Sequence, residues 1–132
     1  AGSIPIPDKN NVDAMCNFNN AINDVLKDNR MLHFYPEGSM WYFYEGLREF
    51  LPGAFRYAVI NNVPVIPLAI SYRPPKGLFK LWKRNGAPCV NIEIGKPIYP
   101  NKDISKGEAI KEMKQIAYYN IKNMMEKNTP EI

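Results

Sequence analysis

The stretch Val63-Pro64-Val65-Ile66-Pro67-Leu68-Ala69-Ile70 decides the fold of this chain. Its apolar character is nearly continuous, which is typical of a strand covered on both faces of a sheet. Because proline has no N–H to donate to a neighbouring strand, Pro64 and Pro67 place this strand at an edge or at a bulge. The stretch therefore predicts a sheet with an irregular strand over residues 63–70.

The sequence on either side of this strand predicts alternating helices and strands. Residues 53–60 predict a short helix, which ends at Asn61-Asn62 and buries Ala54, Tyr57 and Ala58. Residues 89–94 predict a half-exposed strand, since Val90, Ile92 and Ile94 alternate with polar residues. Residues 31–35 predict a buried strand and residues 4–7 a short or edge strand.

Two longer segments predict amphipathic helices. Residues 13–27 carry one apolar stripe and residues 105–126 carry another. The stripes consist of Met15, Phe18, Ile22, Val25 and Leu26 for the first helix, and of Ile104, Ile110, Met113, Ala117, Ile121 and Met124 for the second. The predicted class is α/β, with a short mixed sheet flanked by helices in a single domain, residues 1–132.

Composition narrows the classes of protein. Hydrophobic residues make up 45% of the 132 residues and charged residues 23%, an ordinary globular balance. No apolar run approaches the roughly 18 residues that a membrane-spanning helix needs, and no signal segment opens the chain. Cys16 and Cys89 are isolated and His33 is the only histidine, so we expect no metal site, no disulfide and a reducing, cytosolic setting.

The turn Pro36-Glu37-Gly38-Ser39 directly follows the predicted strand 31–35. It brings a carboxylate, backbone N–H groups and a hydroxyl to one strand end, where α/β proteins commonly bind ligands. Gly38 lets a bound group approach the backbone closely. An ordinary exposed turn has the same residue types, so the turn alone leaves both interpretations open.

Four blocks resemble the glycerolipid acyltransferase superfamily, above all the lysophosphatidate (1-acylglycerol-3-phosphate) acyltransferases. They are Phe34-Tyr35-Pro36-Glu37-Gly38-Ser39, Phe50-Leu51-Pro52-Gly53-Ala54-Phe55, Val63 to Ile70, and Gly95-Lys96-Pro97-Ile98. Each is similar to a family block, and their order and spacing agree together over roughly residues 1–100. The resemblance implies the C-terminal part of the acyltransferase fold.

The resemblance also implies an activity. Family members move an acyl group from acyl-CoA or acyl carrier protein to a glycerolipid hydroxyl, and no cofactor is needed beyond this thioester co-substrate. In the family, a His followed after four residues by an Asp acts as the general base. His33 has Gly38 five positions on, so the pair is absent. We expect the pair to lie in an N-terminal half that precedes this chain, and the chain alone to be inactive.

The resemblance assigns acceptor binding to the turn region. The expected acceptor-binding residues are Pro36, Glu37, Gly38, Ser39, Arg48 and Arg56. The arginine that the family places after its Pro-Glu-Gly-Thr is Met40 here, and the lysine of its Phe-Lys-x-Gly block is Leu51. Because an arginine fork is the usual bidentate phosphate ligand, these changes leave the acceptor open, with Arg48 or Arg56 as substitutes.

The positive charge is local. The formal net charge is +4, and the stretch from Arg73 to Arg84 holds five basic residues and no acidic one. Within it, large apolar and basic side chains interleave, which favours contact with an anionic membrane. These predicted membrane-contact residues are Leu78, Phe79, Lys80, Leu81, Trp82, Lys83 and Arg84. A solvated loop whose Leu and Trp pack back on the sheet explains the pattern equally well.

These observations predict an enzyme of phospholipid synthesis, peripheral on the inner face of the cell membrane, with lipid and thioester substrates as partners. Two alternatives stay open. A noncatalytic basic module would bind nucleic acid through the Arg73–Arg84 stretch, but it gives no reason for the four blocks, so we expect no nucleic-acid partner. A degenerate acyltransferase kept as a scaffold would share the blocks without the activity.

Overall fold

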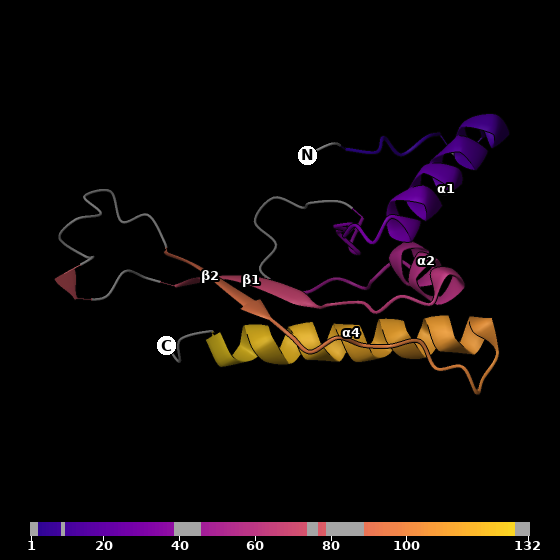
Figure 1. The fold of residues 1–132 in the computed structure, drawn as a ribbon. Helices are drawn as coiled ribbons and strands as arrows, with labels where there is room; N and C mark the ends of the chain where they lie inside the picture. The colour runs from indigo at the N-terminus through magenta and orange to yellow at the C-terminus, as the bar shows by residue number, and fades with distance from the viewer. Residues whose placement is uncertain (1–2, 9, 39–45, 74–76, 79–88, 129–132) are drawn as a thin grey trace.

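The computed structural model describes residues 3–8, 10–38, 46–73, 77–78 and 89–128. Its elements run α1 (Val12–Lys27), α2 (Gly53–Asn61), β1 (Leu68–Arg73), β2 (Cys89–Ile94) and α4 (Lys106–Asn128). Figure 1 shows the β1–β2 pair and α4 running side by side, with α2 packed between α1 and α4. Helices and strands are combined as predicted, and the α/β class is confirmed.

The sheet is an antiparallel pair. Leu68 lies opposite Ile94, and Arg73 lies opposite Cys89. Val65 and Ile98 extend the pairing by an isolated bridge, in which each residue's N–H donates to the other's carbonyl at 2.9 and 2.8 Å. All strand pairing within the described residues is antiparallel, so the parallel component of the predicted mixed sheet is not observed there.

The prolines decide where β1 begins. A strand over residues 63–70 was predicted, but the regular ladder starts only at Leu68, directly after Pro67. Pro64 and Pro67 have no N–H to donate, so the ladder cannot run unbroken through them. The carbonyl of Pro67 still accepts a hydrogen bond from the N–H of Gly95 at 2.8 Å. The predicted irregularity of this strand is therefore confirmed, and its predicted start was too early.

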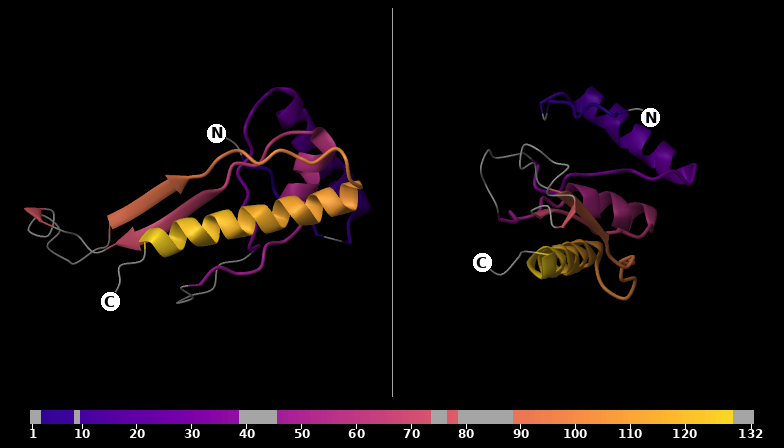
Figure 2. Two further views of the ribbon diagram at one scale, coloured as in Figure 1. Left: turned by 90° about the horizontal axis from the view of Figure 1, so that it is seen from below. Right: turned by 90° about the vertical axis from the view of Figure 1, so that its left-hand side faces the viewer.

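The two faces of the β1–β2 pair differ sharply. One face packs against α4, where Ala69 is 3% exposed, and the left view in Figure 2 shows the helix running alongside β1. The opposite face is apolar and exposed. It consists of Leu68, Ile70, Tyr72, Val90, Ile92 and Ile94. The prediction that this first strand is covered on both faces was wrong: one face is covered, and the apolar side chains of β2 lie on the other.

The N-terminal helix α1 forms as predicted. Asn11 caps it, since the Asn11 side chain accepts a hydrogen bond from the N–H of Ala14 at 3.0 Å. Asp13 in the first turn and Lys27 in the last complement the helix dipole. Ile22, in the middle of the predicted apolar stripe, is the most buried residue of this helix.

Polar side chains join α1 to α2. The Tyr57 hydroxyl donates to Asn19 Oδ1, and Asn61 Nδ2 donates to Asn23 Oδ1 at 2.9 Å. Burial raises the pKa of the Tyr57 hydroxyl above its ordinary value. Asn62 then ends α2 in the left-handed conformation, with φ of 52°. Asparagine tolerates this conformation better than most residues, which explains why the predicted stop is effective.

The core lies between α2, α4 and the segment around Phe50. It is built from Phe50, Phe55, Ala58, Ile98, Met113 and Ala117. The rings of Phe50 and Phe55 stack with centroids 6.2 Å apart. The predicted C-terminal stripe is confirmed at its most buried positions, whereas α2 buries Phe55 and Ala58 most deeply, and Ala54 and Tyr57 only in part.

Residues 31–35 do not form the predicted buried strand. This segment alternates, with Leu32 and Phe34 half-buried, while Met31 is 90% exposed and Tyr35 is 76% exposed. The ring of Phe34 stacks on Tyr57, with centroids 6.2 Å apart. The segment has no ladder partner among the described residues, and the ring contact with Tyr57 packs it against α2. The predicted short strand over residues 4–7 is likewise irregular.

Candidate functional site

The turn over residues 36–38 depends on glycine. The N–H of Gly38 donates to the carbonyl of Tyr35 at 3.1 Å and closes the turn. Gly38 has φ of +75°, a conformation that costs an L-residue energy. A Cβ at this position would also lie 2.5 Å from Leu51 Cδ1. The backbone conformation therefore favours glycine here, and Leu51 would have to move away from any larger residue.

Two hydrogen bonds hold this turn against residues 47–51. Glu37 Oε2 accepts from the backbone N–H of Arg48 at 3.1 Å. The N–H of Leu51 donates to the carbonyl of Pro36 at 2.7 Å. The first bond is partly buried and has an ionised acceptor, which makes it stronger than a neutral one. The Glu37 carboxylate is thereby fixed on the segment that leads into α2.

A cleft of about 550 Å³ opens beside this carboxylate. Its lining comes from the turn, from the segment before α2 and from α4. It consists of Glu37, Leu47, Arg48, Glu49, Phe50, Leu51, Pro52 and Lys114. The cleft thus combines a fixed carboxylate, apolar walls and basic side chains, a combination typical of binding sites for polar organic molecules.

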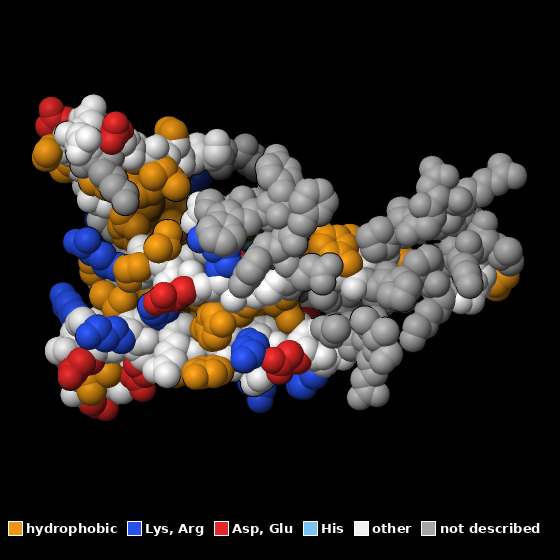
Figure 3. Space-filling view, turned by 180° about the vertical axis from the view of Figure 1, so that it is seen from behind, with side chains coloured by type: hydrophobic (Ala, Val, Ile, Leu, Met, Phe, Trp, Pro, Cys, Tyr) orange, Lys and Arg blue, Asp and Glu red, His pale blue; other side chains and the backbone are white. Residues whose placement is uncertain are grey.

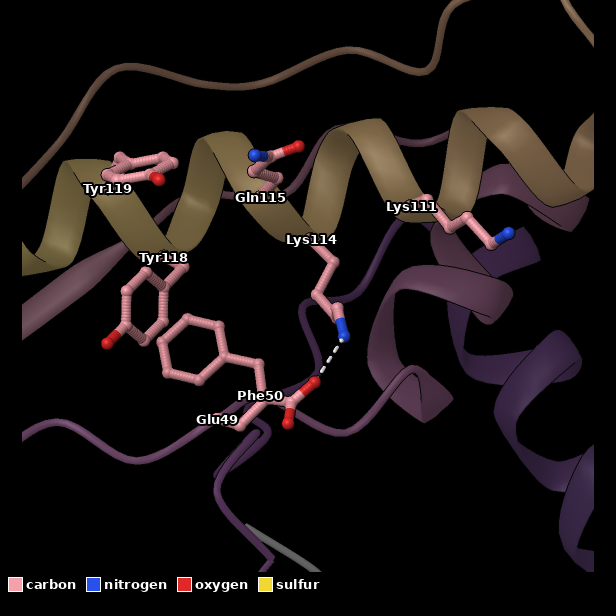
Figure 4. A pocket seen from close by; sticks show the side chains of 7 residues that line it. All are labelled: Glu49, Phe50, Lys111, Lys114, Gln115, Tyr118 and Tyr119. Atoms are coloured by element: carbon pink, nitrogen blue, oxygen red, sulfur yellow. Dashed lines mark hydrogen bonds and ion pairs between the residues drawn. The ribbon is translucent and has the colours of Figure 1, made fainter.

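A second hollow of about 330 Å³ continues along α4 (Figure 4). Lys114 Nζ forms an ion pair with Glu49 Oε1 at 3.1 Å, and the Tyr118 ring meets Phe50 edge to face at 5.3 Å. Figure 4 shows Lys111 one turn earlier on the same helix, directed away from Glu49. Glu49, Phe50 and Lys114 line both hollows, so the two form one groove around Lys114.

The structure brings some of the predicted acceptor-binding residues together. Glu37 and Arg48 line the same cleft and share a hydrogen bond, with Pro36 and Gly38 beside them. Arg56 is exposed on α2 and lines neither hollow. Ser39 lies outside the described residues. The site is therefore the turn together with residues 47–52 and α4.

Sequence reasoning missed the contribution of α4. Lys114 follows Glu37 at a great distance in the chain and belongs to no motif. The only available signal was helical spacing, which places Lys111, Lys114 and Tyr118 on one side of the predicted C-terminal helix. That spacing cannot show which part of the chain faces this side.

His33 and Leu78 line neither hollow of the groove. His33 is exposed, and its ring centroid lies 4.7 Å from that of Tyr35. Of the predicted membrane-contact residues, Leu78 is 83% exposed, and Phe79, Lys80, Leu81, Trp82, Lys83 and Arg84 lie outside the described residues. On the face shown in Figure 3, basic and acidic side chains are interspersed over the described part.

The described residues contain no group of three or more His, Cys, Asp or Glu side chains that could hold a metal ion. None of their helices combines the length and the apolar character needed to cross a bilayer.

A family model described as Acyltransferase matches residues 1–71. The match covers more than half of the chain and includes the turn at Glu37, the segment before α2, and α2 itself, so the chain belongs to the acyltransferase family. No curated protein and no solved structure matches the chain. Lys111, Lys114 and the rest of α4 lie beyond the matched residues.

Proposed function

We propose that this acyltransferase moves a fatty acyl group from a thioester, acyl-CoA or acyl carrier protein, to a lysophosphatidate-like glycerolipid hydroxyl in phospholipid synthesis. The observation that carries the proposal is the Glu37 carboxylate, fixed by the N–H of Arg48 at the mouth of a 550 Å³ cleft within the family match. The similarity of the sequence blocks to lysophosphatidate acyltransferases supports the choice of acceptor.

The reaction needs an activated hydroxyl. The acceptor oxygen forms a bond to the thioester carbonyl carbon, the C–S bond breaks, and the proton of the hydroxyl passes to a base and finally to the departing thiolate. Glu37 Oε2 is engaged by Arg48, and we assign the remaining oxygen of this carboxylate to the polar groups of the acceptor. In this role Glu37 binds and orients the acceptor.

The general base is a separate part of the proposal. His33, the only histidine, is exposed beside Tyr35 and lacks the family's aspartate partner. We therefore propose that these 132 residues by themselves do not catalyse acyl transfer. Saturable, acceptor-dependent thiol release by the isolated chain would overturn this part.

The experiment for the function uses the protein as its own cells produce it. Release of free thiol from acyl-CoA or from acylated carrier protein is followed with and without lysophosphatidate. Acceptor-dependent release is expected, and Glu37→Gln should reduce it at least tenfold, because the substitution removes the charge of the acceptor ligand. Glu126→Gln, on the exposed far end of α4, is the matched control and should leave it unchanged.

Two results would contradict the proposed function. One is the absence of acceptor-dependent thiol release with both kinds of donor. The other is a Glu37→Gln variant as active as the Glu126→Gln control, which would remove Glu37 from the site.

Membrane contact through residues 78–84 belongs to the same proposal, with the protein peripheral on the inner face of the cell membrane. Its support is the sequence of the segment, where each basic residue near an anionic surface contributes about 1 kcal/mol of attraction. Replacing Lys80, Lys83 and Arg84 with Gln should weaken co-sedimentation with vesicles that contain anionic phospholipid. Unchanged sedimentation would refute this contact.

A further inference from the structure

The groove beside Glu37 holds a lysine that no acyltransferase block supplies. Lys114 comes from α4, beyond the residues that match the family. Its side chain is 28% exposed, and its ammonium lies 3.1 Å from Glu49 Oε1, at the junction of the two hollows. The Lys114 ammonium can therefore attract an anion in either hollow, and the carboxylate of Glu37 lines one of them.

The sequence itself lacks two of the cations that the family blocks carry. Leu51 occupies the position of the lysine in the second block, and this leucine lines the cleft. Met40 stands where the first block of the family has its arginine. The basic residues that line the cleft are Arg48 and, from another element, Lys114 of α4, which supplies positive charge to the second hollow as well.

We propose that Lys114 binds the phosphomonoester group of a substrate in the groove between residues 47–52 and α4. The inference rests on the proposed function and deepens it, because it assigns the anion-binding residue of that site. The second hollow adds Lys111, whose exposed ammonium strengthens the positive potential along the same side of α4. Phe50 and Tyr118, whose rings meet edge to face, form the apolar part of the lining of this hollow (Figure 4).

The ion pair with Glu49 is suited to exchange. The Glu49 side chain is 88% exposed, and an ion pair with one partner so well solvated contributes little to stability. A phosphomonoester carries close to two negative charges at neutral pH and offers three acceptor oxygens, against the single charge of a carboxylate. It therefore displaces Glu49 from the Lys114 ammonium, which has three donors. Glu49 then competes with the phosphomonoester for Lys114, which binds whichever of the two anions is present.

Two substrates of the proposed reaction have a phosphomonoester group. A lysophosphatidate-like acceptor has a phosphomonoester head group, and coenzyme A has one at the 3′ position of its ribose. Isothermal titration calorimetry of the chain with glycerol 3-phosphate, coenzyme A and 3′-dephospho-coenzyme A separates them. Binding of glycerol 3-phosphate identifies the acceptor as the source. Binding of coenzyme A together with loss for the dephospho form identifies the donor.

Three variants test the role of Lys114, because they are expected to lower, raise or leave unchanged the affinity for the phosphomonoester. Lys114→Gln should weaken binding of the phosphomonoester about tenfold or more, the loss typical of one charged hydrogen bond. Glu49→Gln should strengthen binding, about twofold to fivefold, because it removes the competing carboxylate. Lys122→Gln, on α4 outside the groove, removes the same charge and should leave binding unchanged. Far-ultraviolet circular dichroism verifies that each variant is folded.

The inference is overturned if none of the three probes binds at millimolar concentration, or if Lys114→Gln and Lys122→Gln weaken binding equally. It is also overturned if Glu49→Gln weakens binding. These failures are distinct from failure of the proposed function. Lys114-dependent binding without any acyl transfer by the native protein would refute the function and leave the site. If the Lys114→Gln variant transfers the acyl group at the wild-type rate and no phosphomonoester probe binds, the Lys114 site is refuted and the proposed function remains.

Discussion

Replacement of Gly38 by alanine should destabilise the turn that carries Glu37, through two separable effects. The first is the backbone, because φ of +75° costs an L-residue about 1–2 kcal/mol. The second is steric, since the new Cβ would lie 2.5 Å from Leu51 Cδ1. Leu51 is 56% exposed and can rotate away, which limits the steric cost to roughly 0.5–1.5 kcal/mol. The free energy of unfolding should therefore fall by about 1.5–3.5 kcal/mol.

Two further variants separate the effects. The double variant Gly38→Ala with Leu51→Ala removes the clash and keeps the backbone cost. In the Leu51→Ala background, Gly38→Ala should therefore lower the free energy of unfolding by about 1 kcal/mol less than it does in the wild type. Gly38→Asn keeps the clash, but asparagine tolerates positive φ, so this variant should be more stable than Gly38→Ala. Leu51→Ala alone is the reference for the double variant.

The assay is urea unfolding followed by circular dichroism at the helical minimum, with free energies from linear extrapolation. The reasoning is refuted if Gly38→Ala is as stable as the wild type. Full recovery in the double variant would show that the clash, and not the backbone, is what requires glycine. In either case the turn would owe its shape to something other than the conformation of Gly38.

Three other predictions follow from burial, capping and charge. Met113→Ala should cost about 2–5 kcal/mol of unfolding free energy, whereas Ile92→Thr, on the exposed apolar face, should cost below about 1 kcal/mol and lower the fluorescence of a bound hydrophobic dye; equal costs would contradict the assigned faces. Asn11→Ala should cost about 1 kcal/mol, measured by urea unfolding, because the N–H of Ala14 loses its acceptor. The Ser105 hydroxyl donates to Glu108 at 2.7 Å and lowers the pKa of that carboxyl, so this contribution to stability is present above the unfolded pKa and lost as pH falls through the folded one. Ser105→Ala should flatten the loss of stability as pH falls below the ordinary pKa of a glutamate, and an unchanged pH profile would exclude the contact.

The exposed face of the sheet is a feature that the sequence pattern could not predict. The alternation of Val90, Ile92 and Ile94 predicts the strand correctly, and β2 has the predicted bounds. Alternation alone leaves open which face a neighbouring element covers, and α4 packs on β1 at the face of Ala69. Gly95 lies close to this packing, since a Cβ on it would lie 2.8 Å from Pro67 Cγ and 3.4 Å from Met124 Cε.

The sequence by itself determined the features that depend on near neighbours in the chain. Helical periodicity and capping located α1 and α4, Asn62 ended α2, and Gly38 shaped the turn of the acyltransferase block. These features need only local sterics and hydrogen bonds, which neighbouring residues supply. Family membership depends on the same local blocks.

Tertiary structure decided which distant residues meet. Residues 31–35 have the composition of a strand but no ladder partner among the described residues, and strand formation needs one. The groove is a sharper case, since packing of α4 on Phe50 brings Lys114 to Glu49 and to the cleft of Glu37. No local pattern encodes that meeting, because it depends on how two apolar faces pack together across the whole chain.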